Sequence, residues 1–445
     1  MTTKNIYAGV PLALLVITCW PVAAQETVGT SATVLAEQAT QDTPSKQLRT
    51  NTSNVLNGAQ GVTLVPAVSP SLNGNGIIWL EGVGQPKVTL GYTLNGGWDS
   101  RPEETKSAPS SGLFFANFYL AANGRVGGTQ YLLQYAPTLT KYTSGRYSGG
   151  VFHVASAKLF GTLGERWFWS SEAGLTYGKD ALRFLTPSNT SAVGDVTAVN
   201  TNASTFRPQA GSGLFIALKA ELSYRTSETG TVQFQASDLH SHLSGLNDDD
   251  FGTARFSYTR RLSPRLGVGS YAQLLIDSAS PDCVNSGAGI SADIKISKFT
   301  EFSVSGGPQL QSGGCSGRGA FGNAFFTSEL SASTQIYGVL SRQFTSSYLG
   351  PASWQDNVGA GVARKIADFG FVGTDVNYTH NEKTSLLPGY HGIFLSATYG
   401  RRAPHGLSPS ISYRHLMNSV AGVGWNRDVA LFSLTWQSNA ISLSR

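Results

Sequence analysis

The densest group of side chains that could bind a metal ion surrounds two histidines. His240 and His242 are separated by one residue and lie close to Asp238 and to the acidic run 248–250. Imidazole and carboxylate groups are common ligands of divalent cations. Their spacing, however, departs from the pattern of a calcium-binding loop. We therefore interpret this segment as a solvated external loop, and we predict no metal site.

Signals for enzymatic chemistry are weak. The chain has no Gly-x-Ser-x-Gly motif, no lysine-bearing phosphate loop and no Cys-x-x-Cys pair. Residues 317–322 match Gly-x-Gly-x-x-Gly, but dinucleotide binding requires a strand before this motif and a helix after it. Here a loop is expected before it and a strand after it. We therefore predict no catalytic residue and no cofactor.

Ionisable residues inside the periodic segments mostly share one parity. In 214–224, leucines and Ile216 alternate with Lys219, Glu221 and Ser223. The residues assigned in this way to a polar row are Lys158, Glu172, Lys219, Glu221, Arg255, Asp293, Lys295, Glu329, Arg342, Asp375 and Arg414. Side chains two residues apart on one strand face are roughly 6–7 Å apart, as in Lys219 with Glu221 and Asp293 with Lys295. Such residues would form either a selectivity ring around a pore or a set of ion pairs in its wall. Because the two signs nearly balance, we expect no strong ion selectivity.

The elements that carry these residues are predicted to be β-strands. From Pro86 onward we expect about eighteen strands, with sixteen as the alternative count, each long enough for a tilted span of ~9–11 residues. Every second connection is tight, at 123–125, 163–165, 227–230, 263–264, 297–299 and 332–334. The connections between them are mostly longer, as at 101–111, 179–210, 240–250, 312–319, 381–389 and 418–425. Short and long connections that alternate along the chain are typical of barrels that span an outer membrane.

The apolar rows agree with a membrane barrel. One row contains Val88, Leu90, Tyr92 and Leu94; the others contain Trp167, Trp169, Ala173, Leu175 and Tyr177, then Ile393, Leu395, Ala397 and Tyr399, then Ala430, Phe432, Leu434 and Trp436. Tyr and Trp at row ends fit the interfacial girdles of such barrels. Residues 86–445 thus resemble a Gram-negative outer-membrane β-barrel of the porin type, an all-β antiparallel up-and-down barrel. One departure is the C-terminus: the last aromatic residue is Trp436, yet the chain continues to Arg445.

Composition and the N-terminus fit an exported membrane protein. Of 445 residues, only 13% are charged and 51 are glycine, and the net charge of +5 does not indicate nucleic-acid binding. Residues 1–24 read as a signal peptide with cleavage before Gln25. Residues 25–85 read as a periplasmic tail or linker, with a small plug as the alternative. Cys283 and Cys315 are expected at the same rim of the barrel, and we predict a disulfide between them.

The predicted function is a channel in the outer membrane for a hydrophilic solute or polymer, which would diffuse through a polar lumen. Loop 179–210 would either narrow the lumen or stay outside. The expected neighbours are outer-membrane lipid and lipopolysaccharide, and barrels of this size often form homotrimers. Two alternatives stay open. One is an exopolysaccharide export barrel; the other is a rim-active hydrolase that uses serine and one of the seven histidines.

Overall fold

The computed structural model describes the chain from residue 87 to residue 442. Gaps in this description lie at 103–108, 148, 180–211, 244–247, 279–281, 298, 316, 332, 348–349, 367–369, 384–388, 402–406, 421 and 439–440. The predicted signal peptide, the predicted tail or plug and most of loop 179–210 are outside the described residues. Within the described part, no helix is long and apolar enough to cross a membrane.

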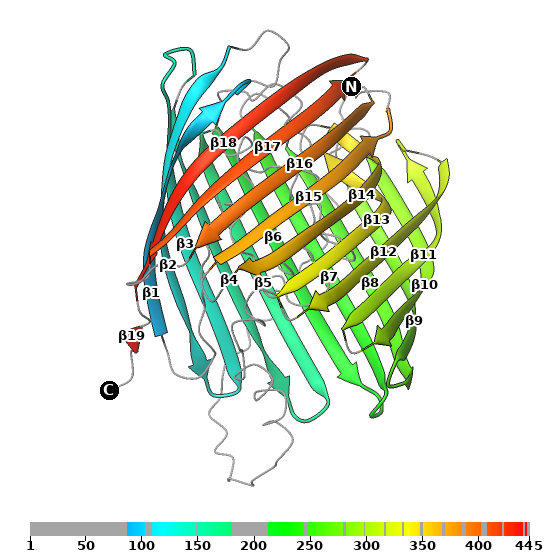
Figure 1. The fold of residues 1–445 in the computed structure, drawn as a ribbon. Coiled ribbons are helices and arrows are strands. Elements are labelled where there is room, and N and C mark those ends of the chain that lie inside the picture. Colours follow the sequence, from blue (N-terminus) through cyan, green and yellow to red (C-terminus); the bar gives the residue numbers. More distant parts are fainter. Residues whose placement is uncertain are drawn as a thin grey trace, which may run out of the picture.

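The described residues form one antiparallel sheet of long strands (Figure 1). The strands are β1 (Lys87–Asp99), β2 (Ser111–Val126), β3 (Thr129–Tyr142), β4 (Gly150–Leu163), β5 (Trp167–Lys179), β6 (Ser212–Arg225), β7 (Gly230–Leu243), β8 (Asp249–Ser263), β9 (Leu266–Asp277), β10 (Cys283–Ser297), β11 (Thr300–Gly313), β12 (Gly317–Ser331), β13 (Thr334–Ser347), β14 (Gly350–Ile366), β15 (Gly370–Asn381), β16 (Tyr390–Arg401), β17 (Leu407–Val420), β18 (Val423–Gln437) and β19 (Ile441–Ser442).

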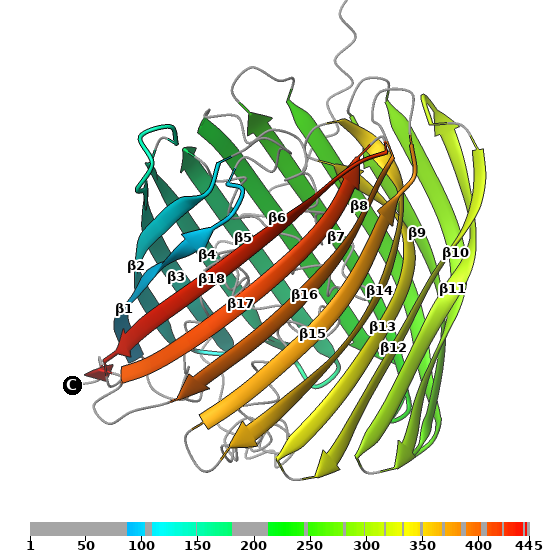
Figure 2. The ribbon, with the colours of Figure 1, turned by 45° about the horizontal axis from the view of Figure 1, so that its top comes forward.

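The sheet closes on itself, which confirms the predicted antiparallel barrel. Each strand pairs with the next along the chain, and β1 pairs with β18 from Gly91–Gln437 to Asp99–Val429. The two-residue β19 continues this pairing at Lys87 and Val88 after a break. Pairing with β1 thus continues beyond Trp436, which lies within β18 and is stacked on Tyr92 at 5.6 Å between ring centroids. In Figure 2, β4–β8 form the wall opposite β14–β17.

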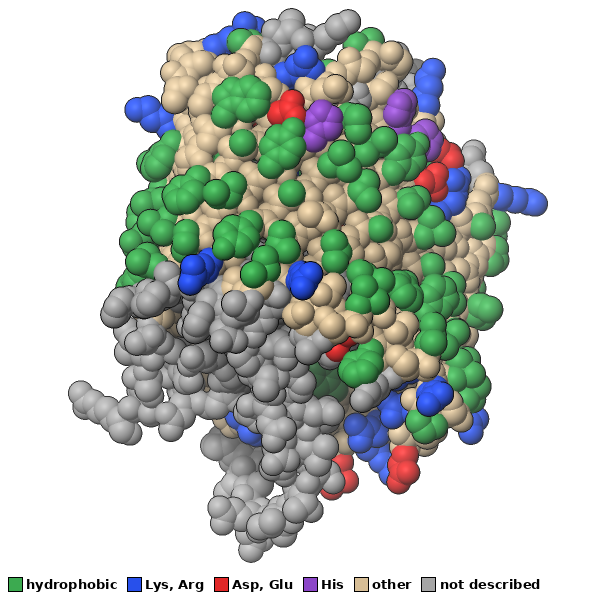
Figure 3. Space-filling model, in the orientation of Figure 1, with side chains coloured by type: hydrophobic (Ala, Val, Ile, Leu, Met, Phe, Trp, Pro, Cys, Tyr) green, Lys and Arg blue, Asp and Glu red, His purple; other side chains and the backbone are tan. Residues whose placement is uncertain are grey.

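Strict alternation of side chains explains why these segments form a barrel wall. In β5, Ser170, Glu172 and Thr176 are buried, whereas Trp167, Leu175 and Tyr177 are exposed on the other face. We call the buried face the inner row and the exposed face the outer row. The predicted apolar rows all lie outside, and Figure 3 shows hydrophobic side chains spread over the outer surface. A closed sheet with an apolar outer face and a polar inner face is the outer-membrane type of barrel.

The two ends of the barrel differ in their connections. At one end, here the turn end, β2–β3 and β4–β5 are joined by tight turns in which Gly127 and Gly164 have φ values of 59° and 69°. Glycine adopts this left-handed conformation more readily than residues with a Cβ atom. The opposite end, here the loop end, carries the longer connections between β1 and β2 and between β5 and β6. The predicted alternation weakens in the second half, where β13–β14 and β17–β18 are also joined by short connections at the loop end.

The predicted disulfide is confirmed. Cys283 begins β10 at the loop end, Cys315 follows β11 at the same end, and the two form a disulfide with their Cα atoms 5.3 Å apart. The bond therefore ties together the two strands of the β10–β11 hairpin at its open end. Cys283 is buried, and Cys315 packs against the apolar cluster inside the barrel mouth.

Candidate functional site: the inner wall of the barrel

A row of charged side chains crosses three neighbouring strands at mid-height. Lys158 on β4 pairs in register with Glu172 on β5, which pairs in register with Lys219 on β6. The ammonium nitrogen of Lys158 is 2.5 Å from a carboxylate oxygen of Glu172, which is buried. Because all three lie on the inner row, antiparallel pairing places alternating charges side by side on the lumen wall. The sequence identified the three residues but not their contacts.

A second row continues the polar wall toward β9. Glu221 is opposite Gln235, and Gln235 is opposite Arg255. The Arg255 guanidinium lies over the ring of Tyr271, with its central carbon 3.9 Å from the ring centroid. A guanidinium held against an aromatic face gains a cation–π contribution. This contact also orients Arg255 along the wall.

The facing wall carries an acid and a base at similar height. Asp375 on β15 accepts hydrogen bonds from Ser396 and, at 3.1 Å, from the amide of Asn377. Arg414 on β17 is opposite Ser396, is buried, and lies 6.0 Å from the ring centroid of Phe394. The mid-height of the lumen is thus charged on both walls, with both signs on each wall.

A buried ion pair bridges the seam where the barrel closes. Arg427 on β18 donates to both carboxylate oxygens of Asp99 on β1, at 3.0 and 2.6 Å. The exposed fractions of the two side chains are 6% and 0%. Ser433 and Asn95 form a further buried hydrogen bond across the same seam, at 2.6 Å. The sequence analysis did not single out Asp99 or Arg427, because they approach each other only when the first and last strands meet.

Three of the predicted residues lie near the turn end rather than at mid-height. Asp293 accepts a hydrogen bond from Ser303 at 2.6 Å, and Lys295 forms an exposed ion pair with Glu301 at 3.5 Å. Asp293 and Lys295 share one face of β10, and each contacts the neighbouring strand β11. Glu329 lies on the inner row of β12, close to its end. These side chains lie on one side of the turn end of the barrel.

Arg342 stands apart from the other predicted wall residues. It shares its row with the exposed Leu340, not with the buried Ser341, so it belongs to the outer row of β13. It donates to Asp356 at 2.9 Å and to Glu382 at 2.5 Å. Here β12 stops pairing with β13: the last pair is Gly322–Arg342. Beyond this point β13 continues to pair only with β14.

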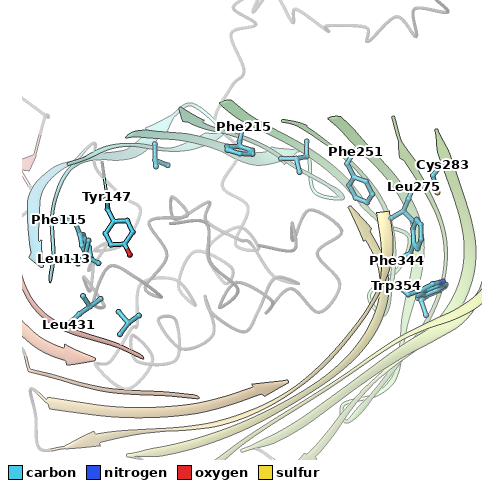
Figure 4. Close-up of a cluster of buried hydrophobic side chains, with 14 of the residues drawn as sticks. Leu113, Phe115, Tyr147, Phe215, Phe251, Leu275, Cys283, Phe344, Trp354 and Leu431 are labelled. Atoms are coloured by element: carbon cyan, nitrogen blue, oxygen red, sulfur yellow. The ribbon is translucent and has the colours of Figure 1, made fainter. Parts of the chain in front are cut away.

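The β13–β14 hairpin therefore leaves the wall at Arg342 and turns into the barrel. Trp354, on the same hairpin face as Arg342, is buried against the inner-row Gly319 of β12, where a Cβ atom would lie 2.1 Å from its ring. Its ring centroid is 5.7 Å from that of Phe344. Figure 4 shows Phe344 and Trp354 beside Leu275 and Cys283, with the strands of the wall behind them. Phe344 and Trp354 therefore lie inside the loop end of the barrel.

An apolar cluster lines the inside of the loop half, and the sequence analysis missed it. Its members come from strands around the barrel and include Leu113, Phe115, Phe215, Leu239, Phe251, Tyr271, Leu275, Phe321 and Leu431 (Figure 4). In these strands, aromatic and aliphatic residues take the place of polar residues on the inner row toward the loop end. The sequence did carry a signal for this cluster. In Leu113–Phe115, three consecutive large residues place apolar side chains on both faces of the strand.

The histidine segment differs from the solvated loop that we predicted. His240 and His242 lie within β7, on the outer row, and bind Asp250 and Asp248, each at 2.5 Å. His153 and His415 also lie on outer rows and contact Tyr135 and Asp428. In the part of the chain that the structure describes, no group of three or more His, Cys, Asp and Glu side chains could hold a metal ion.

The chain is similar to known proteins only at the level of solved structures. No protein-family model matches the chain, and no curated protein matches it. Among solved structures, it is similar to OccAB4 of Acinetobacter baumannii, with 9% identity, a TM-score of 0.46 and coverage of 80% of this chain and 99% of that chain. It is similar to OpdL of Pseudomonas aeruginosa at 12% identity and a TM-score of 0.45, with coverage of 80% and 99%. A ferric enterobactin receptor of the same organism, PfeA, has 8% identity and a TM-score of 0.42, with coverage of 81% and 82%. The function therefore rests on the residues of this barrel.

Proposed function

We propose that the protein is an outer-membrane channel through which a hydrophilic solute diffuses. The observation that carries this proposal is the contrast between the two faces of the closed sheet. Outside, apolar side chains face a hydrocarbon environment; inside, charged and hydroxyl side chains follow the wall on both sides of the barrel. A polar inner wall offers a solute replacement for its water contacts, while the outer face keeps the barrel in the lipid.

The proposed lining residues are Lys158, Glu172, Lys219, Glu221, Arg255, Asp293, Lys295, Glu329, Asp375 and Arg414. We leave Arg342 out of the lining because it lies on the outer row of β13. There its guanidinium forms ion pairs with Asp356 and Glu382. Five of the ten are basic and five are acidic. Wall charges of both signs favour passage of polar solutes over strong selection of one ion.

Conductance in planar bilayers tests the proposal. Purified full-length protein is expected to give stable steps in potassium chloride, and liposomes that contain it should swell in an isotonic solution of a small sugar. A barrel that is folded, as judged by its heat-shifted mobility on a gel, yet never conducts would contradict the channel. Lipid hydrolysis without conductance would favour the alternative of a rim-active hydrolase.

Removing basic charge from the wall should change ion selectivity. Lys158→Gln with Lys219→Gln leaves Glu172 and Glu221 on the same wall without their basic neighbours. The permeability ratio of potassium to chloride, measured from the reversal potential in a salt gradient, is expected to rise severalfold because the local potential becomes negative.

The matched control is Lys141→Gln, which removes a lysine on the outer row of β3, opposite the exposed Phe114. Its reversal potential should equal that of the wild type. If both variants shift the reversal potential equally, the charges of β4–β6 do not line the conducting path.

A further inference from the structure

We propose that the inner wall of β9–β12, together with the inward end of the β13–β14 hairpin, binds an uncharged polyhydroxylated solute such as a sugar chain. This inference rests on the proposed channel function and names the class of solute that the channel would select. We call this stretch of the wall the amide–aromatic patch. It comprises Tyr271, Asn285, Gln309, Phe321 and Trp354.

Two amide side chains in the patch have unfilled hydrogen-bonding capacity. Asn285 on β10 and Gln309 on β11 lie on the inner row, with exposed fractions of 0% and 1%. Neither the oxygen nor the nitrogen of either amide has a hydrogen-bond partner. Buried polar groups are paired in the great majority of native proteins, and those that are unpaired call for an explanation. A bound molecule that both donates and accepts hydrogen bonds would satisfy all four atoms.

Two aromatic rings lie against the wall close to these amides. Tyr271 and Phe321 have ring centroids 5.6 Å apart. Gly287 and Gly289, on the inner row of β10, provide the space for the rings: a Cβ atom there would lie 3.0 Å from Phe321 and 2.9 Å from Tyr271. Larger residues at these two positions would push the rings away from the backbone.

The inward hairpin adds a third ring to the patch. Trp354 packs on Gly319 of β12, and Gly319 is opposite Gln309 in the register of β11 and β12. The indole nitrogen of Trp354 donates to the amide oxygen of Gln311 at 3.0 Å, and the Gln311 amide donates to the carbonyl oxygen of Cys315 at 3.1 Å, in the orientation that satisfies both groups. The disulfide and the hairpin thus fix the indole beside the free amides.

This chemistry selects for hydroxyl groups rather than for charge. The unfilled groups are amides, which donate and accept equally, as hydroxyl groups do. The Arg255 guanidinium, which lies over the Tyr271 ring, is already engaged by that contact. Ligand sites in proteins commonly combine apolar and aromatic walls with a few fixed polar groups. A sugar ring presents both an apolar face for the aromatic rings and hydroxyl groups for Asn285 and Gln309.

The test replaces the two amides by apolar groups of similar shape. In Asn285→Leu with Gln309→Met, folding stability should be unchanged or higher, because no buried polar group is left unpaired. The dissociation constant for a linear neutral oligosaccharide of glucose, measured by calorimetry on the full-length protein in detergent, should rise roughly tenfold or more. Each interruption of the single-channel current by the same sugar should also be shorter in this variant than in the wild type, because the sugar dissociates faster.

The matched control is Asn357→Ala. Asn357 is also a buried inner-row amide, but Ser341 and Thr379 already fill its hydrogen bonds. Its sugar affinity should equal that of the wild type. A wild-type channel that conducts but binds no sugar would overturn the inference, as would equal sugar affinity in the wild type and the Leu/Met variant. A protein that binds sugar through these amides but never conducts would support the patch and contradict the channel.

Discussion

Asp99→Ala should destabilise the barrel by about 3–5 kcal/mol, the typical cost of removing one partner from a buried ion pair. Arg427 would keep its buried position while losing both hydrogen bonds to the carboxylate. The effect should concentrate at the seam, because Asp99 and Arg427 belong to the two strands that close the sheet. Reversible unfolding in urea, followed by tryptophan fluorescence in lipid vesicles, measures the change.

Glu301→Ala is the matched control for this prediction. It removes the carboxylate of an ion pair with Lys295 whose side chains are 58% and 56% exposed, and exposed pairs contribute about 0–1 kcal/mol. The double change Asp99→Leu with Arg427→Met should recover much of the lost stability, because no buried charge is left without a partner. Equal losses for Asp99→Ala and Glu301→Ala would show that burial of the seam pair does not determine its contribution.

The two faces of the wall could be predicted from the sequence because side-chain direction in a strand depends only on parity. Segment 214–224 illustrates this: Lys219 and Glu221 lie inside, and Leu218 and Leu222 lie outside. Tight turns at every second connection indicated that consecutive strands are neighbours, since antiparallel neighbours need only short connections. The fold class and the site of the disulfide both followed from these local patterns.

Contacts between strands could not be predicted, because they depend on register. Lys158 and Glu172 are adjacent only because β4 and β5 pair at that position, and Lys295 selects Glu301 of β11 over Asp293 of its own strand. The seam pair is the extreme case, because its members are 328 positions apart in the sequence. One sequence carries no direct signal for such partners.

The inward hairpin shows a second feature that the alternation of side chains along a strand cannot predict. Arg342 and Trp354 occupy the outer row, and a straight strand would have presented both to lipid. Because the hairpin turns inward at Arg342, its outer row faces the inner wall of β12. Alternation fixes which side chains share a face; it does not fix what that face contacts after a bend. Trp354 joins the amide–aromatic patch through this bend, so its place in the patch could be recognised only in three dimensions.

Phe256→Arg should cost about 2–4 kcal/mol, the penalty for arginine on the lipid face near the middle of a membrane. Phe256 lies in the middle of β8, is 52% exposed on the outer row, and is opposite Phe234 and Ala272 on the neighbouring strands. The adjacent Arg255 already places a guanidinium at this height on the inner side. Moving an arginine by one residue along the strand therefore tests which solvent each face meets. Urea-induced unfolding from phosphatidylcholine vesicles measures the penalty.

Thr259→Arg provides the comparison on the same strand. Thr259 lies three residues further along, on the inner row opposite Thr231 and Gly269. An arginine there keeps access to the water of the lumen, so its cost should stay within about 1 kcal/mol, as for ordinary substitutions away from buried features. If Thr259→Arg proves the more damaging of the two, the hydrocarbon lies on the other side of the wall, and the lumen assignment of all ten lining residues is reversed. If both cost little, the outer face of β8 meets water, and this barrel does not span a membrane.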